Sequence, residues 1–262
     1  MLLSSKYWLT FYHSIASILE YRFNLITHII KYSIFNLLMG MVWYATAHET
    51  GSTLSGPELL SYFVISGIIF GLSNFHAYYI EEDISTGNIS KFLTRPLPAF
   101  WAYFAQESGT AVLEMVIKAM ALIPVLAAVG FTFPANAQQY LLLLCFLPLI
   151  FLFSFSFFAI FSFMAFWFTE IYALRWGVAA GMRFMAGFFV PISLMPLWFQ
   201  NISFYLPFQH LGTTPILLMQ NGVDALYGLK ALLILMFWTA CVYYLQQKIW
   251  STAVRTFEGV GI

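Results

Sequence analysis

The chain has 262 residues, of which 61% are hydrophobic, 20% aromatic and only 8% charged, and its formal net charge is zero. About 25% of the residues of a soluble domain are charged, so this composition excludes an ordinary soluble protein, and the neutral balance offers no basic surface for nucleic acid. The apolar runs are long enough for helices that cross a hydrocarbon core of about 30 Å, and they do not alternate as β-barrel strands do. We therefore expect an all-α polytopic membrane protein with a single transmembrane domain, 1–262.

Residues 1–20 combine an apolar face, which includes Trp8 and Phe11, with a polar face that includes Lys6 and His13. This spacing predicts an N-terminal helix that lies in the membrane interface. The alternative is that these residues simply begin the first membrane span.

Six apolar runs follow. We expect spans at 23–47, 59–80, 104–130, 139–166, 173–195 and 226–248. One set of connecting segments holds Lys6, Arg22, Lys91, Arg95, Arg175, Lys248 and Arg255, and the opposite set, 48–58, 131–138 and 196–225, holds no Lys or Arg. Because positive residues stay on the cytoplasmic side, both termini and the loop 81–103 are expected to face the cytoplasm.

The loop 81–103 gathers five charged residues in an otherwise apolar chain: Glu81, Glu82, Asp83, Lys91 and Arg95. Such a segment is unfavourable in lipid, so we expect a cytoplasmic surface that a partner protein binds. Three consecutive carboxylates point in different directions around a helix. A solvated helix end is therefore favoured over a cation site.

Three further charges fall inside predicted spans. Glu114 and Lys118 lie four residues apart in the acid-first order that forms a pair on one helix face. Arg183 lies roughly 15 Å into the fifth span by helical rise, where a charge costs about 3 kcal/mol and needs a partner or water. The three side chains either line or brace a substrate route, or Arg183 and Glu114 form a purely structural pair between the third and fifth spans.

The fifth span and the segment after it contain unusual small residues and prolines. Gly177 and Gly181 have the spacing that lets another helix approach closely, either within the chain or from a second subunit. The segment 196–225 stays hydrophobic although prolines interrupt it. We expect short helices that return toward the membrane as a re-entrant outer hairpin; an ordinary amphipathic helix outside the membrane is the alternative.

The sequence contains no nucleotide-binding G-x-x-x-x-G-K-[ST] loop and none of the common hydrolase motifs. Its five histidines share no helical spacing that would hold a metal, and Cys145 and Cys241 lie in separate apolar runs, where we expect them to be packed in the core. We therefore expect a protein that is not an enzyme and has neither a metal site nor a cofactor of its own.

Four segments together resemble the membrane subunit of ABC exporters of the type-two permease class, in the branch related to drug and viologen export permeases, over nearly the whole chain. They are Glu20-Tyr21-Arg22-Phe23-Asn24; the loop residues Gly87, Leu93, Arg95, Pro96 and Pro98; the stretch from Pro196 through Pro207-Phe208 and Pro215 to Gly222; and the tail from Trp250 through Arg255 to Gly261, in which Phe257 stands where a tyrosine is expected.

This resemblance implies a permease of the bacterial inner membrane that forms a dimer with the same or a paralogous permease subunit. Two separate ATP-binding subunits, which hold ATP and Mg, would sit beneath the 1–20 helix and the 81–103 loop and drive efflux. The residues expected to couple the chain to the ATPase are Glu82, Asp83, Gly87, Lys91, Arg95 and Pro96, and those expected to form an outer gate are Pro207 and Phe208.

An ion-coupled secondary transporter is the alternative function. It would use an intramembrane carboxylate, Glu107 or Glu114, as a proton site. Such transporters commonly contain paired repeats, and the sequence shows none.

Overall fold

The computed structural model describes residues 2–47, 55–73, 77–93, 98–134, 136–168 and 170–256, with side chains for all of these except 2–5, 22, 24, 93 and 256. Every regular element in these ranges is a helix, which confirms the all-α class. Within these ranges, five stretches are long and apolar enough to cross a membrane: Leu25–Thr46, Ala99–Ala128, Ala137–Phe166, Ala225–Ala253 and Gly56–Ser85, the last of which includes residues 74–76 outside the described part. A multi-pass membrane protein is therefore confirmed.

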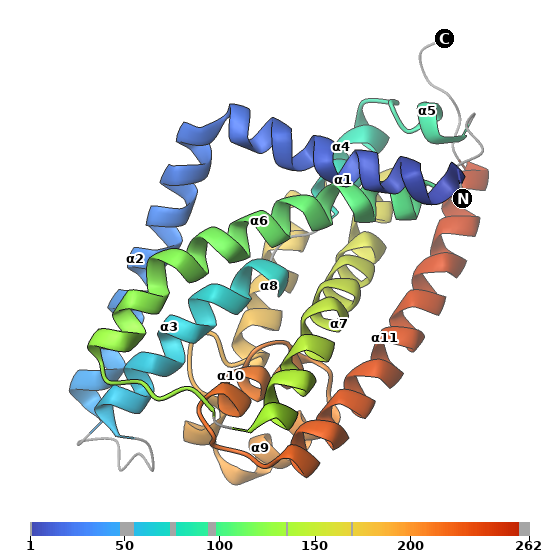
Figure 1. Cartoon of the computed structure of the whole chain (residues 1–262). Coiled ribbons are helices and arrows are strands. Elements are labelled where there is room, and N and C mark those ends of the chain that lie inside the picture. Colours follow the sequence, from blue (N-terminus) through green and yellow to red (C-terminus); the bar gives the residue numbers. More distant parts are fainter. Residues whose placement is uncertain are drawn as a thin grey trace.

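The chain begins with α1 (Leu2–Glu20), which is separated from α2 (Arg22–Thr46) by a change of direction at Tyr21. Figure 1 shows α1 lying across the first part of α6 (Ala99–Ala128). The two helices touch closely at Gly109, where an added Cβ would lie 2.6 Å from the Phe11 carbonyl oxygen. A distinct helix over 1–20 is thus confirmed, while its place in the membrane interface stays a prediction.

Helix α3 (Gly56–Ser73) forms the centre of the fold, because most of its side chains are buried. Small residues let its neighbours approach. A Cβ on Gly40 of α2 would lie 2.7 Å from Leu60, and a Cβ on Gly67 would lie 3.2 Å from Leu122 of α6. Close packing of this kind replaces the hydrophobic driving force that helices lack in lipid.

Helices α7 (Ala137–Ser162) and α11 (Ala225–Ala253) pack against each other on the other side of α3, and the 3-10 turn η1 (Phe163–Phe166) follows α7. Side-chain caps define the starts of both helices: Asn136 accepts from the amide of Gln138, and Asp224 from that of Tyr227. Cys145 and Cys241 lie on these helices, and both are exposed. The expectation that they are core residues was therefore wrong.

The expected span at 173–195 is not a continuous helix. Helix α8 covers only Tyr172–Met185, or 14 residues, which is about 21 Å by helical rise and shorter than a hydrocarbon core. Gly187 adopts a left-handed φ of 85°, its amide bonds to the Phe184 carbonyl, and the Phe188 amide bonds to the Arg183 carbonyl. This is the Schellman motif, which ends a helix at a glycine, and Pro191 follows it.

Three short elements follow α8 and the 3-10 turn η2 (Ile192–Leu194): α9 (Leu197–Tyr205), the 3-10 turn η3 (Phe208–Leu211) and α10 (Thr213–Met219). Short, proline-separated helices are therefore confirmed in 196–225, and their depth in the membrane stays a prediction. Figure 1 shows them at the end of the molecule opposite α1, and α11 returns from them to the α1 end, where η4 (Val254–Thr256) follows it.

Candidate functional site

The charged loop contains two short helices, α4 (Tyr78–Ser85) and α5 (Ser90–Leu93). We call residues 77–93 the α4–α5 segment. Gly87 joins the two helices with φ of 75°, a left-handed conformation that glycine adopts without a steric cost. Gly87, one of the residues expected to couple the chain to the ATPase, thus forms the turn between the two helices. Arg95 and Pro96 lie outside the described residues, whereas Pro98 is the residue that precedes the first turn of α6.

Two of the three consecutive acidic residues bind other helices. The Glu81 carboxylate lies 2.7 Å from the guanidinium of Arg175 in α8, and only 14% and 4% of the two side chains are exposed. The Tyr103 hydroxyl of α6 donates to the Asp83 carboxylate at 2.5 Å. The prediction of a solvated helix end was thus wrong for Glu81 and Asp83, because both pair with groups distant in sequence, and only Glu82 is exposed.

Two hydrogen bonds of the Ala77 backbone fix the start of the α4–α5 segment. Its φ is 74°, its amide donates to the buried Glu107 carboxylate at 3.0 Å, and its carbonyl accepts from the Ser162 hydroxyl at 2.9 Å. These bonds join the segment to both α6 and the end of α7. Glu107, which we considered as a proton site, is therefore engaged by the backbone of this segment.

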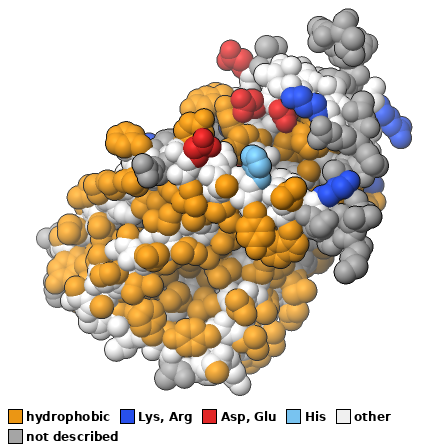
Figure 2. All heavy atoms as spheres, turned by 45° about the horizontal axis from the view of Figure 1, so that its top comes forward, with side chains coloured by type: hydrophobic (Ala, Val, Ile, Leu, Met, Phe, Trp, Pro, Cys, Tyr) orange, Lys and Arg blue, Asp and Glu red, His pale blue; other side chains and the backbone are white. Residues whose placement is uncertain are grey.

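Apolar contacts pack the rest of the α4–α5 segment against the neighbouring helices. Ile84 and Ile89 are buried, and the Phe92 ring lies 4.6 Å from that of Tyr103, between ring centres. Glu82 and Lys91 remain on the surface. The α4–α5 segment is thus an anchored body with exposed charges of both signs. Figure 2 shows acidic and basic side chains gathered on one part of the visible face of the molecule, whereas hydrophobic side chains cover much of the rest.

A second group of charges lies between α2 and α6. Glu114 accepts from the Lys118 ammonium at 3.1 Å, which is the expected pair, and its other oxygen lies 3.6 Å from Nδ1 of His28. Lys118 is 1% exposed, and its ammonium lies 5.6 Å from the centre of the Tyr32 ring. The carboxylate expected to face Arg183 is therefore paired with Lys118 of α6 and lies near His28 of α2.

Arg183 lies on aromatic rings. Its guanidinium carbon is 5.0 Å from the centre of the Phe70 ring of α3 and 5.7 Å from that of Trp176 in its own helix. Such contacts stabilise a cation through the ring quadrupole, more strongly away from water. Phe70 also contacts Tyr32, with ring centres 5.8 Å apart, so one aromatic pair separates Lys118 from Arg183.

Polar contacts hold the short helices of the outer segment, residues 196–225, against one another. His210, fully buried in η3, has Nε2 2.8 Å from the Phe204 carbonyl and Nδ1 2.9 Å from the Thr214 hydroxyl. Because a carbonyl only accepts, Nε2 carries the proton and Nδ1 accepts. Burial lowers the pKa of His210 from 6.5 to about 4, which keeps the ring neutral.

The two residues expected to form a gate lie beside this histidine. Phe208 packs against Phe153 and Phe157 of α7, with ring centres 6.3 and 5.8 Å apart, and Pro207 precedes the first residue of η3. Deeper in the fold, the Tyr62 hydroxyl of α3 donates to the Gly187 carbonyl at 3.0 Å and lies 2.8 Å from the Thr213 hydroxyl. The outer segment is therefore joined to both α3 and the end of α8.

Sequence reasoning missed Arg175, Tyr103, Tyr62 and Thr213. Arg175 was counted only as a cation near a span end, although it is 3% exposed and lies 5.0 Å from the Tyr78 ring. Its partners are close in space and far in sequence, so no local spacing could have found them.

Comparison with known proteins gave one match. A family model described as "ABC-2 family transporter protein" matches residues 34–261. No curated protein and no solved structure matches the chain. The match covers the second half of α2 and every later element, including the α4–α5 segment and the outer helices. The chain therefore belongs to the ABC-2 family of transporter proteins, the multi-pass permease subunits of ABC transporters.

Proposed function

We propose that this chain is the membrane subunit of an ATP-driven exporter of the bacterial inner membrane, related to drug and viologen export permeases. Separate ATP-binding subunits would dock on α1 and the α4–α5 segment from the cytoplasm. The observation that carries the proposal is the anchoring of this segment. Its charges Glu82 and Lys91 are exposed, while the neighbouring Glu81 and Asp83 bind α8 and α6.

This arrangement suits the transfer of force. A partner that moves the α4–α5 segment also moves Arg175 and Tyr103, because a buried ion pair and a short hydrogen bond join them to it. Helix α8 carries Arg175 near its start, and at its far end Gly187 contacts Tyr62 and the outer segment. Displacement at the cytoplasmic end would therefore reach the proposed gate at Pro207 and Phe208.

Coupling is tested by reconstitution with the ATP-binding subunit. Charge reversal by Glu82→Lys or Lys91→Glu should weaken co-purification, because these side chains would contact the partner. Tyr103→Phe should leave co-purification unchanged and lower transport per ATP hydrolysed, because it frees Asp83 from α6. Lys230→Glu, an exposed charge at the other end of the molecule, is the matched control. If both charge-reversal variants bind the ATP-binding subunit normally and couple ATP hydrolysis to transport normally, the α4–α5 segment is not the docking surface.

We place the contact with a second permease subunit on α8. A Cβ built on Gly177 or Gly181 would meet nothing within 4 Å in the described part of the chain, so packing within that part does not account for the glycine pair. A second copy could then approach this face closely. Gly181→Leu should convert the dimer to a folded monomer in size-exclusion chromatography; an unchanged dimer would exclude this face.

The route for substrate is proposed to pass Glu114, Lys118 and Arg183. The same cluster favours the second candidate, an ion-coupled transporter, since Glu114 contacts both a lysine and a histidine. Proteoliposomes that contain only this chain separate the two. Transport driven by a proton gradient without an ATP-binding subunit, and lost in Glu114→Gln, would favour the ion-coupled transporter.

A further inference from the structure

A cavity lies where α1 and α6 separate, on the N-terminal side of their close contact at Gly109. Its volume is about 440 Å³, within the usual range of small-molecule sites. It is lined by Tyr7, Trp8, Phe11, Trp101, Phe104, Ala105 and Ser108. None of the residues discussed above as coupling, route or gate residues contributes to it. We call it the α1–α6 slot.

Aromatic rings form the walls of the slot. Phe104 contacts Phe151 and Phe155 of α7, with ring centres 5.0 and 5.4 Å apart, and Trp8 stacks on Tyr12 at 5.7 Å. The Ser108 hydroxyl already donates to a carbonyl of its own helix at 2.9 Å. The lining has no charged side chain, so the slot suits an apolar ligand rather than a polar one.

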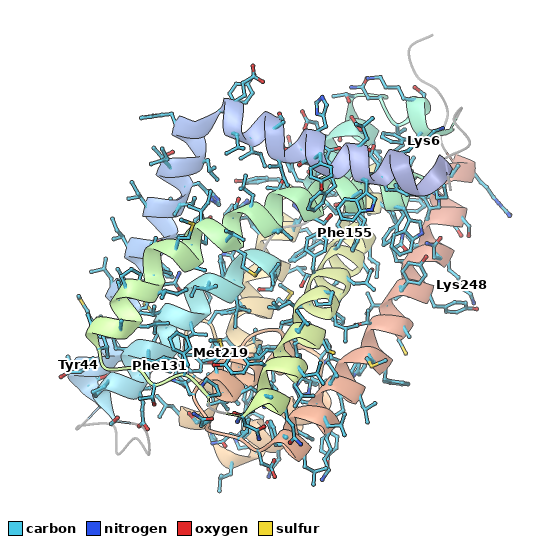
Figure 3. All side chains as sticks on the ribbon, in the orientation of Figure 1. Lys6, Tyr44, Phe131, Phe155, Met219 and Lys248 are labelled. Carbon is cyan, nitrogen blue, oxygen red and sulfur yellow. The ribbon has the colours of Figure 1, made fainter. Side chains whose placement is uncertain are left out.

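The slot lies at a cationic edge of the molecule. Lys6 precedes Tyr7 on α1 and is exposed. Trp101 contacts Tyr243 of α11, with ring centres 6.0 Å apart, and Lys248 follows little more than one turn later. Figure 3 shows Lys6 near the start of α1, Lys248 on the part of α11 that leads to the α1 end, and Phe155 inside the bundle.

The outside of α1 next to the slot is apolar as well. Trp8 and Leu9 are 59% and 71% exposed, and Tyr244 and Leu245 of α11 are also exposed. A surface of this kind, with cations at its edge, is typical of a helix at the boundary between acyl chains and headgroups. In a bilayer, an empty apolar cavity forfeits dispersion contacts that a hydrocarbon chain would restore.

We propose that the α1–α6 slot binds one acyl chain of an anionic phospholipid of the cytoplasmic leaflet, whose phosphate lies near Lys6 and Lys248. The leaflet assignment rests on the topology of the proposed function. The apolar lining selects the chain, and the two cations select a negative headgroup. An uncharged aromatic compound would fit the walls but would leave the two cations without an anionic partner. The bound lipid would tie α1 to α6 close to the α4–α5 segment.

The test uses the full chain, purified without any ATP-binding subunit and placed in nanodiscs. Phosphatidylglycerol or phosphatidylcholine with brominated acyl chains quenches nearby tryptophans. We expect stronger quenching by the anionic lipid, and the excess should disappear in Trp8→Phe/Trp101→Phe, which removes the two reporters in the slot. Lys6→Glu/Lys248→Glu should lower the retention of phosphatidylglycerol in native mass spectrometry several-fold. Lys230→Glu, at the opposite end, should not.

Equal quenching by the two lipids would overturn the proposal, and so would excess quenching that persists without Trp8 and Trp101, since the lipid would then lie elsewhere. Unchanged lipid retention in Lys6→Glu/Lys248→Glu would overturn the headgroup assignment. None of these measurements uses ATP, a partner subunit or transport. A failure here is therefore distinguishable from a failure of the exporter assignment, which co-purification and transport test.

Discussion

The ion pair between Glu81 and Arg175 is the residue-scale feature with the largest expected effect on stability. Both side chains are largely buried, so removal of one partner leaves a charge that water cannot reach. Such losses cost about 3–5 kcal/mol, whereas removal of both charges is often close to neutral. Each single substitution should therefore destabilise the protein more than the double substitution does.

We predict that Arg175→Met lowers the free energy of unfolding by about 3 kcal/mol, and that Glu81→Met/Arg175→Met recovers most of this. Denaturant unfolding in detergent, followed by tryptophan fluorescence, measures both. Glu82→Met, an exposed neighbour, should change stability by no more than about 0.5 kcal/mol. If Arg175→Met behaves like Glu82→Met, the pair does not stabilise the fold.

Glycines 130 and 187 offer a matched comparison at the same scale. Both have positive φ and end a helix with the same pair of backbone bonds. A Cβ on Gly130 would meet nothing within 4 Å, whereas a Cβ on Gly187 would collide with the Thr213 hydroxyl and lie 2.7 Å from that of Tyr62.

Gly130→Ala should thus cost only the backbone strain, about 1–2 kcal/mol. Gly187→Ala adds overpacking and should cost about 3 kcal/mol or more. Gly87→Ala, which also has a positive φ and open space, should follow Gly130→Ala. Thermal unfolding of the three variants checks this order, and equal losses would mean that the contacts at Gly187 are unimportant.

At the scale of elements, the outer segment depends on a neutral histidine. The folded-state pKa of His210 is about 4, below about 6.5 in an unfolded chain. The unfolded state therefore takes up a proton that the native state excludes. Stability from this group is complete above pH 6.5 and is lost as the pH falls toward 4, by up to about 3 kcal/mol.

We predict that the unfolding free energy of the native chain falls between pH 6.5 and 4.5 more steeply than that of His210→Gln, which keeps polar atoms but cannot gain this charge. The difference between the two pH profiles isolates the histidine from the carboxylates that titrate in the same range. Parallel profiles would contradict the burial of a neutral ring.

The sequence predicted the long elements well, since runs of apolar residues determine them. Helices α2, α6, α7 and α11 lie close to their expected bounds, and the break at Tyr21 separates α1. The expected span at 173–195 failed because hydropathy continues through Gly187 and Pro191 although the helix does not. A glycine followed by a proline was the available signal for that end.

The candidate site was only partly predictable. Local spacing identified the pair of Glu114 and Lys118. It could not identify the partners of Glu81 and Asp83, because Arg175 and Tyr103 come from other helices and only packing brings them near. The loop's charges therefore divide into anchors and exposed groups, a distinction that the sequence does not contain.

At the scale of the whole molecule, the connectivity leads us to predict a sixth passage. The end of α7 lies beside α4, as the bond between Ser162 and Ala77 shows, while α11 begins at the opposite end, near α10 (Figure 1). The chain between them must therefore run the length of the molecule. Helix α8 begins near α4 through Arg175 and leads to the outer helices, although it is too short to cross a bilayer alone.

Cysteine labelling distinguishes six passages from five. In a background that carries Cys145→Ser and Cys241→Ser, which removes both exposed thiols, single cysteines are placed by Lys91→Cys, Asn201→Cys and Arg255→Cys, all at exposed positions. With six passages, an impermeant maleimide should label Lys91→Cys and Arg255→Cys only from the cytoplasm and Asn201→Cys only from outside. If α8 and the residues after it do not cross the membrane, Asn201→Cys would be labelled from the cytoplasm, as Lys91→Cys is. Arg255→Cys would then be labelled from outside. That pattern would also overturn the cytoplasmic C-terminus, and with it the placement of the α11 end beside the ATP-binding subunits.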